Sequence, residues 1–255
     1  MNANLGFMRK SLKYVVIGYV FLHSLSFVVA QPNPTIEEKP SLYRVKSGDT
    51  LHALLDRYVL SSNLLPELLQ ANPGINPDEL RIGQILVIPR HLIRYTPSRA
   101  IVAYSKCASA IFLADSKKEL KLGSVIVQGD VIQVPALCDM SLQFEDGSIV
   151  RMPSGGTIKV ALLRKSPLEK SPEVQLSLQD GRVEVRVPKR QSGDAPFGVN
   201  TPNSVAGVRG TEFRVGFDSA SGTGKVEVSS GVVATKGVMD IEEAGVTAQK
   251  GVLIP

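Results

Sequence analysis

The chain has 255 residues, of which 43% are hydrophobic and 21% are charged. This composition is typical of a globular protein with one or two buried cores, and it excludes wholesale disorder. The formal net charge of +5 comes largely from residues 1–30, which hold Arg9, Lys10 and Lys13 and no acid. The remaining chain has 26 basic and 24 acidic residues, no Trp and no dense basic stripe, so nucleic acid is not an expected partner.

The first 30 residues have the order of a secretory signal peptide. The three basic residues precede a mostly apolar stretch over residues 14–29, and Val28 and Ala30 supply the small residues of a cleavage site. A membrane anchor is the rival interpretation, but the apolar run is short for a span and contains His23, Ser24 and Ser26. We expect cleavage before Gln31, export, and no stable membrane span afterwards. Residues 31–41, with three prolines, are predicted to form an extended linker.

Cys107 and Cys138 are 31 positions apart in a chain expected to reach an oxidising compartment. They form a disulfide or remain two buried thiols, and the sequence leaves both alternatives open. Catalytic and metal sites are not expected: His52 and His91 are the only histidines after residue 30, without zinc-like spacing to Cys. No G-x-S-x-G or P-loop pattern occurs. We therefore predict no enzyme activity, no cofactor and no metal.

Residues 43–88 predict a strand, two helices and a closing strand. Four residues with a spacing of i, i+3, i+4 and i+7 indicate one apolar helix face: Leu51, Leu54, Leu55 and Tyr58. Asp49 is expected to cap this helix. A second helix is predicted over residues 64–71, ending at Asn72-Pro73-Gly74. The two short strands are expected to pair with each other.

The connector over residues 91–120 has no clear period, and its structure is left unassigned. After it, apolar and polar residues alternate in short runs, a pattern typical of an all-β domain. The runs are separated by glycines that we interpret as turns: Gly147, Gly181, Gly210, Gly231, Gly237, Gly245 and Gly251. Alternation is clearest in three runs: residues 174–178, 182–187 and 211–218. From the pattern alone, a solenoid-like roll and a sandwich fit equally well.

The segments YRVKSGDTLHALLDRY and LLQANPGINPDELRIGQILVIP resemble the lysin motif, LysM, over about residues 42–90. The segment between Tyr58 and Asn72 is a few residues longer than is usual in that family. The resemblance implies a βααβ fold that binds N-acetylglucosamine polymers, in bacteria the glycan of peptidoglycan, in a shallow groove between two loops. Those loops correspond here to Gly48, Asp49, Thr50 and Leu51 and to Pro73, Gly74, Ile75 and Asn76.

An acetamido sugar offers an amide donor, a carbonyl acceptor, hydroxyls and a methyl group, so backbone groups of tight turns can bind it. Leu51 or Ile75 is expected to supply a small apolar contact. Purely structural roles are the alternative for these residues: Asp49 as a helix cap, Gly48 and Gly74 as turn residues, and Tyr58 as a core residue.

A second resemblance covers Leu122 to Asp218, on LGSVIVQGDVI, LQFEDGSIVRM, VQLSLQDGRVEVRV and FGVNTPNSVAGVRGTEFRV. These segments are similar to the FecR-type domain of periplasmic regulators, which implies a β-rich, solenoid-like fold. The anti-sigma segment and membrane helix of such regulators are not present between Gln31 and Leu120, so signalling of that form is not expected. Residues 219–255 are expected to add further strands, and a missing C-terminal segment stays an open alternative.

The expected order is therefore a signal peptide (1–30), a linker (31–41), a small α+β LysM domain (42–90), a connector (91–120), and an all-β, solenoid-like FecR-type domain (121–218) with further strands (219–255). The expected function is non-enzymatic binding of peptidoglycan in the periplasm of a Gram-negative-type envelope, with the β domain engaging an envelope protein or serving as scaffold. The alternatives are a wall-targeted peptidoglycan-remodelling enzyme and an accessory envelope sensor.

Overall fold

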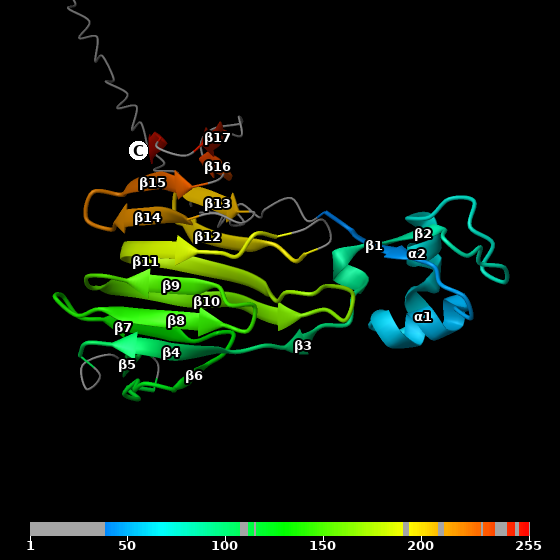
Figure 1. The fold of residues 1–255 in the computed structure, drawn as a ribbon, viewed down its shortest axis with the longest axis horizontal. Helices are drawn as coiled ribbons and strands as arrows, with labels where there is room; N and C mark the ends of the chain where they lie inside the picture. Colours follow the sequence, from blue (N-terminus) through cyan, green and yellow to red (C-terminus); the bar gives the residue numbers. More distant parts are fainter. Residues whose placement is uncertain are drawn as a thin grey trace, which may run out of the picture. The chain divides into compact units, whose positions relative to one another are not determined.

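The computed structural model describes residues 39–107, 112–114, 116–190, 194–208, 212–230, 232–237, 244–247 and 250–254 (Figure 1). The expected signal peptide, the linker up to residue 38, and the turns expected at Gly210 and Gly231 lie outside these residues. Among the described residues, no helix has both the length and the apolar character needed to cross a membrane.

The first part of the described chain is a small α+β unit. Its elements, in chain order, are β1 (Ser41–Arg44), α1 (Leu51–Tyr58), the 3-10 helix η1 (Ser62–Leu64), α2 (Leu65–Gln70) and β2 (Ile85–Ile88). β1 and β2 pair antiparallel, with Tyr43 opposite Leu86. The four residues predicted for the apolar face of the first helix are all buried, which confirms that prediction. Their side chains form one core with both strands and Leu68 of α2.

The rest of the described chain is mostly β, and we call it the β module. Its strands are β3 (Thr96–Pro97), β4 (Ala100–Ser105), β5 (Phe112–Leu113), β6 (Val125–Ile126), β7 (Val131–Val134), β8 (Met140–Phe144), β9 (Ile149–Met152), β10 (Gly156–Lys165), β11 (Glu173–Arg186), β12 (Phe197–Thr201), β13 (Ser204–Val208), β14 (Glu212–Asp218), β15 (Thr223–Ser230), β16 (Val232–Gly237), β17 (Ala244–Thr247) and β18 (Lys250–Ile254). β3, β4 and β5 lie within the connector that the sequence left unassigned.

These strands form two hydrogen-bonded runs that share β11. The first run has the order β6, β4, β8, β9, β11, β14, β15, β18, and the second has the order β5, β7, β10, β11, β12, β13, β16, β17. β3 pairs with the far end of β10. Inward side chains from β4 to β15 of the first run and from β7 to β12 of the second belong to a single apolar core. Alternation along these strands therefore buries one face, as the sequence pattern predicts.

β11 passes from one run to the other at Gly181. Its first half pairs with β10 and β12, and its second half pairs with β9 and β14. Gly181 has φ +91°, and a Cβ there would lie 2.4 Å from the Gly155 carbonyl oxygen. The predicted turn at Asp180-Gly181 is wrong, because the chain continues as one strand through this bend. Gly245 and Gly251 likewise lie inside β17 and β18 rather than in turns.

A buried charge network joins the segment after β2 to the loop between β10 and β11. In η2 (Arg90–Leu92), Arg90 pairs with Glu169 at 2.5 Å and Glu173 at 3.1 Å, and all three side chains are 2–4% exposed. Arg164 also pairs with Glu173, and its guanidinium lies 3.8 Å from the centre of the Tyr95 ring. Burial lowers the pKa of Arg90, but the hydrogen bond to Glu169 and the charge of Glu173 together hold it above its ordinary value.

Candidate functional site

Asp49 fixes the turn between β1 and α1. Its Oδ2 atom accepts hydrogen bonds from the Lys46 amide and from the Tyr43 hydroxyl, each at 2.7 Å. Gly48 has φ +84°, which a residue with a side chain rarely adopts. The Lys46 amide, and then the Tyr43 hydroxyl, hold the pKa of Asp49 below its ordinary value. Burial, together with the hydrogen bond to Asp49, raises the pKa of Tyr43.

The residue that caps α1 is Thr50. Its backbone is extended, and its hydroxyl accepts a hydrogen bond from the Ala53 amide at 3.2 Å. The prediction that Asp49 caps the helix is wrong, because the Asp49 carboxylate turns back to the preceding turn. Leu51 is only 3% exposed and belongs to the core, so its side chain does not offer the apolar contact expected for a sugar.

The second predicted loop, residues 73–76, follows a buried asparagine. Asn72 donates hydrogen bonds to the carbonyls of Leu68 and Val87, and its Oδ1 accepts one from the Val87 amide at 2.7 Å. Gly74 has φ +84°, and the Asn76 side chain accepts a hydrogen bond from the Asp78 amide. Pro73, Gly74 and Asn76 are exposed, whereas Ile75 is half-buried against the core.

Both loops are attached to the extended chain that includes β2, from its two opposite sides. The chain leading into the first loop is held where Val45 exchanges backbone hydrogen bonds with Gly83 and Gln84. The second loop is held where Asn72 bonds Val87. Gln84 and Val87 are three residues apart along an extended chain, about 10 Å. The two anchors therefore tie both turns to neighbouring points of one extended segment.

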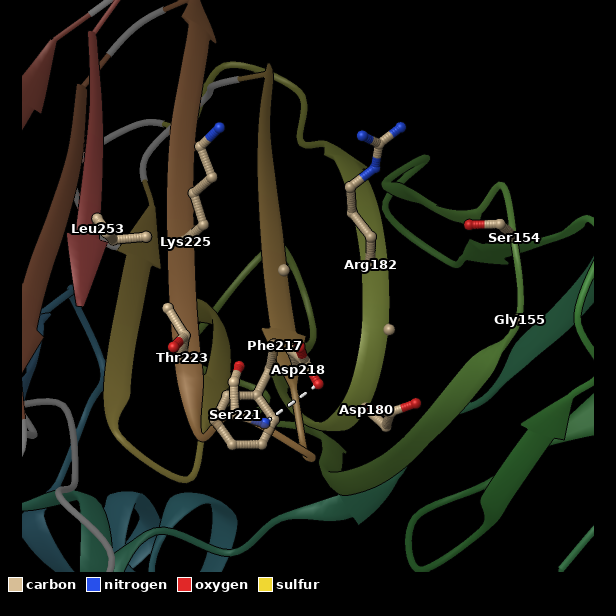
Figure 2. A pocket seen from close by; sticks show the side chains of 12 residues that line it. Ser154, Gly155, Asp180, Arg182, Phe217, Asp218, Ser221, Thr223, Lys225 and Leu253 are labelled. Carbon is tan, nitrogen blue, oxygen red and sulfur yellow. Dashed lines mark hydrogen bonds between the residues drawn. The ribbon is translucent and has the colours of Figure 1, made fainter. Parts of the chain in front are cut away.

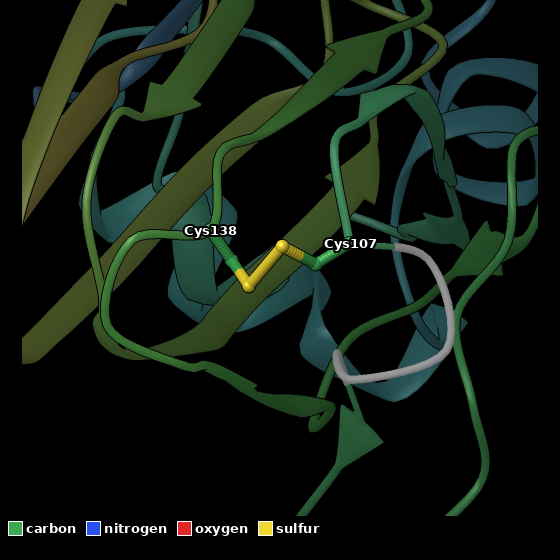
Figure 3. The surroundings of a disulfide bond; sticks show 2 residues. All are labelled: Cys107 and Cys138. Carbon is green, nitrogen blue, oxygen red and sulfur yellow. A yellow bond between two sulfur atoms is a disulfide. The ribbon is translucent and has the colours of Figure 1, made fainter.

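Cys107 and Cys138 are joined as a disulfide, with their Cα atoms 5.5 Å apart (Figure 3). The bond lies just beyond the paired ends of β4 and β8, where Ser105 is opposite Met140. It contributes no reactive thiol to either predicted loop. The role of this disulfide is structural, because Cys138 is 5% exposed and lies in the core of the β module.

A groove on the β module was not predicted from the sequence (Figure 2). It has a volume of about 590 Å³ and lies over β11, β14 and β15. Charged side chains at its rim include Arg182, Lys225, Asp180 and Asp218. One sequence signal points to it: Gly216 interrupts a strand whose other outward positions are charged. Among the described residues, no cluster of three or more His, Cys, Asp or Glu side chains is placed to hold a metal.

Comparison with protein families gives two matches. The family described as LysM domain matches residues 43–89, and the family described as FecR protein matches residues 130–234. No curated protein matches the chain.

Two crystal structures of a candidate anti-sigma factor from Parabacteroides distasonis ATCC 8503 are similar to part of the chain. They are 18% and 17% identical, with TM-scores of 0.39 and 0.40, and each alignment covers 48% of this chain. The aligned part spans about half of the length of that protein, 53%. The two family matches fall on the two parts of the fold, residues 43–89 on the small α+β unit and residues 130–234 on the β module: the chain contains a LysM domain followed by a FecR-type domain.

Proposed function

We propose that this is a non-enzymatic protein of the cell envelope that binds the N-acetylglucosamine-containing glycan of peptidoglycan through its LysM domain. The observation that carries the proposal is the pair of exposed glycine turns, at Gly48 and Gly74, attached to one strand of a matched LysM domain. Export to the periplasm of a Gram-negative-type envelope belongs to the same proposal, and is supported by the predicted signal peptide and by the disulfide.

The proposed site binds a neutral ligand through its backbone. Gly48 and Gly74 carry no side chain, so a sugar can approach the peptide groups of both turns closely. Exposed amides and carbonyls match the acetamido group and the hydroxyls of the sugar. Ile75, half-buried at the loop, takes the apolar role that Leu51 cannot fill, and packs against the acetyl methyl group. No ionisable group takes part, so binding is expected to be insensitive to pH near neutrality.

The β module is proposed to be solenoid-like and to act as scaffold or protein-binding surface. Both of its runs advance roughly in chain order, the first from β4 to β15 and the second from β7 to β16. On the outward face of the first run, charged side chains pair across neighbouring strands, as between Arg214 and Glu184 at 3.0 Å. Such a polar face suits recognition of an envelope protein better than catalysis.

A pull-down with purified insoluble peptidoglycan tests this proposal. Deleting the LysM domain is a poor variant, because loss of Arg90 leaves Glu169 buried without its ion-pair partner and Glu173 paired with Arg164 alone. Gly74→Val is better, since a Cβ at this position meets no atom within 4 Å and only the turn geometry changes. The matched control is Gly123→Val in the β module, where φ is +80° and a Cβ also meets nothing within 4 Å.

We expect the wild-type chain and Gly123→Val to sediment with the wall, and Gly74→Val to bind at least about tenfold more weakly. Soluble N-acetylglucosamine oligomers should compete with the wall for the wild type. Retention of full binding by Gly74→Val would contradict the placement of the glycan site. Release of muropeptides in the same tubes would indicate the wall-remodelling enzyme instead.

A further inference from the structure

The outward face of β11, β14 and β15 carries rows of side chains set by the strand register. In one row, Glu184 lies opposite Arg214, which lies opposite Glu227, so an arginine is flanked by two acids. In the next row, Arg182 lies opposite Gly216, which lies opposite Lys225. This second row therefore has two cations and no acidic side chain between them.

Gly216 is not required by the backbone. Its φ is not positive, and the pairing of β14 with its neighbours shows no bulge at this position. A Cβ built there would come no nearer than 3.9 Å to any neighbouring atom, so there is also no close packing to exclude a side chain. Glycine weakens a strand interior, and glycines in strands often occur at bulges, at bends, or where a ligand or another backbone approaches closely. Gly216 has no bulge and no close backbone contact, which leaves the approach of a ligand.

The two cations beside Gly216 keep hydrogen-bonding capacity for a ligand. Arg182 is 50% exposed, and its ion pair with Glu184 is long, at 3.5 Å. Glu184 also lies within 3.5 Å of both Arg151 and Arg214, so one carboxylate is shared by three guanidinium groups. Lys225 pairs with Glu227 at 2.5 Å and is 58% exposed, and its ammonium group has three N–H donors, so the pair with Glu227 does not use its full hydrogen-bonding capacity. Figure 2 shows the Arg182 and Lys225 side chains on the two sides of β14. Two strand spacings, about 10 Å, separate the backbones that carry them.

Acidic side chains lie at the other end of the same groove. Asp180 precedes Arg182 by two residues on β11, and Asp218 follows Gly216 by two residues on β14, a step of about 7 Å along each strand. Asp180 accepts hydrogen bonds from the Ser219 amide and hydroxyl, and Asp218 accepts one from the Ala220 amide. These bonds fix both carboxylates at the turn between β14 and β15. The groove is therefore positive at one end and negative at the other.

We propose that this groove binds a short peptide with a free carboxylate and a free amino group. The carboxylate lies over Gly216, between Arg182 and Lys225, and takes the place of the missing acidic side chain. The ammonium group lies toward Asp180 and Asp218. The two charged ends of a dipeptide are about 7 Å apart, which matches the step between the rows. The proposal does not depend on glycan binding by the LysM domain.

Titration of the full chain with the dipeptide alanylalanine, followed by calorimetry or NMR shifts, tests the site. We expect saturable binding, at least about tenfold weaker when the carboxylate is replaced by an amide. Acetylation of the amine should weaken binding by a smaller factor, about threefold, because the two acids are solvent-exposed. Absence of saturable binding, or equal binding of the amide form, would overturn the proposal.

Two sets of variants locate the binding. Gly216→Glu places a carboxylate of the protein between the two cations and should reduce the affinity for the dipeptide at least about tenfold. The control, Ser229→Glu, adds the same charge elsewhere on β15 and should leave the affinity unchanged. Should Gly216→Glu fail to fold, Arg182→Gln with Lys225→Gln removes both cations, and Arg186→Gln on the same strand is its control. Unchanged affinity in a folded groove variant would show that the dipeptide binds elsewhere.

Discussion

At the scale of single residues, the first LysM turn depends on one carboxylate with two donors. Asp49 joins the Lys46 amide to the Tyr43 hydroxyl, while the neighbouring Thr50 caps the helix. The sequence could predict that this turn exists, since Gly48 and a helix start are visible in it. It could not tell which of two adjacent capping residues serves the helix, because Asp and Thr both accept backbone hydrogen bonds well.

The lowered pKa of Asp49 predicts a pH effect on stability. A carboxyl whose pKa is lower in the folded state stabilises that state above its unfolded pKa, which is near 3.8, and the contribution is lost as the pH falls through the folded pKa. Asp49→Asn should therefore destabilise the protein at pH 7 and make less difference below about pH 3. Urea unfolding at both pH values measures this.

Asp56→Asn, which removes an exposed carboxylate from α1, controls for the change in charge. An equal loss of stability at both pH values in Asp49→Asn would show that the ionised carboxylate is not what holds the turn.

At the scale of elements, periodicity predicted α1 because this helix buries one complete face, and the shortness of β1 and β2 predicted that they pair with each other. The second helix, predicted over residues 64–71, is confirmed as α2, with Pro66 in its first turn, whereas the short η1 before it was not predicted. β4 was missed because a bulge between Val102 and Tyr104 breaks its alternation. The bend in β11 was predicted to be a turn, because the sequence Asp180-Gly181 is compatible both with a turn and with a bend inside a strand.

Asn72 is the element-scale residue with the largest expected effect. It is 6% exposed and makes three hydrogen bonds that hold the end of α2 to β2. Asn72→Ala leaves buried backbone groups unpaired, so we expect a loss of about 2–4 kcal/mol in the free energy of unfolding. Asn76→Ala, at an exposed turn, should change it by less than about 0.5 kcal/mol. Denaturant unfolding of both variants measures the difference, and similar losses would contradict the anchoring role of Asn72.

At the scale of the whole described chain, the LysM core is continued by contacts from the β module. Leu168, in the loop between β10 and β11, packs against the LysM core, and Ser41 of β1 donates a hydrogen bond to Glu169. Sequence reasoning did not find this junction, because Arg90 and Glu169 are 79 positions apart and each resembles an ordinary surface charge. Only the fold brings them together and removes water from both.

Removing Arg90 should separate the unfolding of the two domains. Arg90→Ala leaves Glu169 and Glu173 buried with less compensation, which typically costs about 3–5 kcal/mol. We expect one calorimetric transition in the wild type, and a lower, split transition in the variant. Arg44→Ala removes an exposed arginine of the same domain and should leave a single transition. A single, unshifted transition in Arg90→Ala would show that the network does not couple the domains.

The sharing of β11 by both runs has a consequence for how the chain folds. Partners of this one strand extend from Ile149 to Phe217, so neither run is continuous until residues far apart in the sequence have met. Long-range pairings of this kind close large loops before they gain contacts, and such topologies fold slowly. The rate at which the β module folds is therefore expected to be governed by the docking of a single central strand, rather than by the hairpins on either side of it.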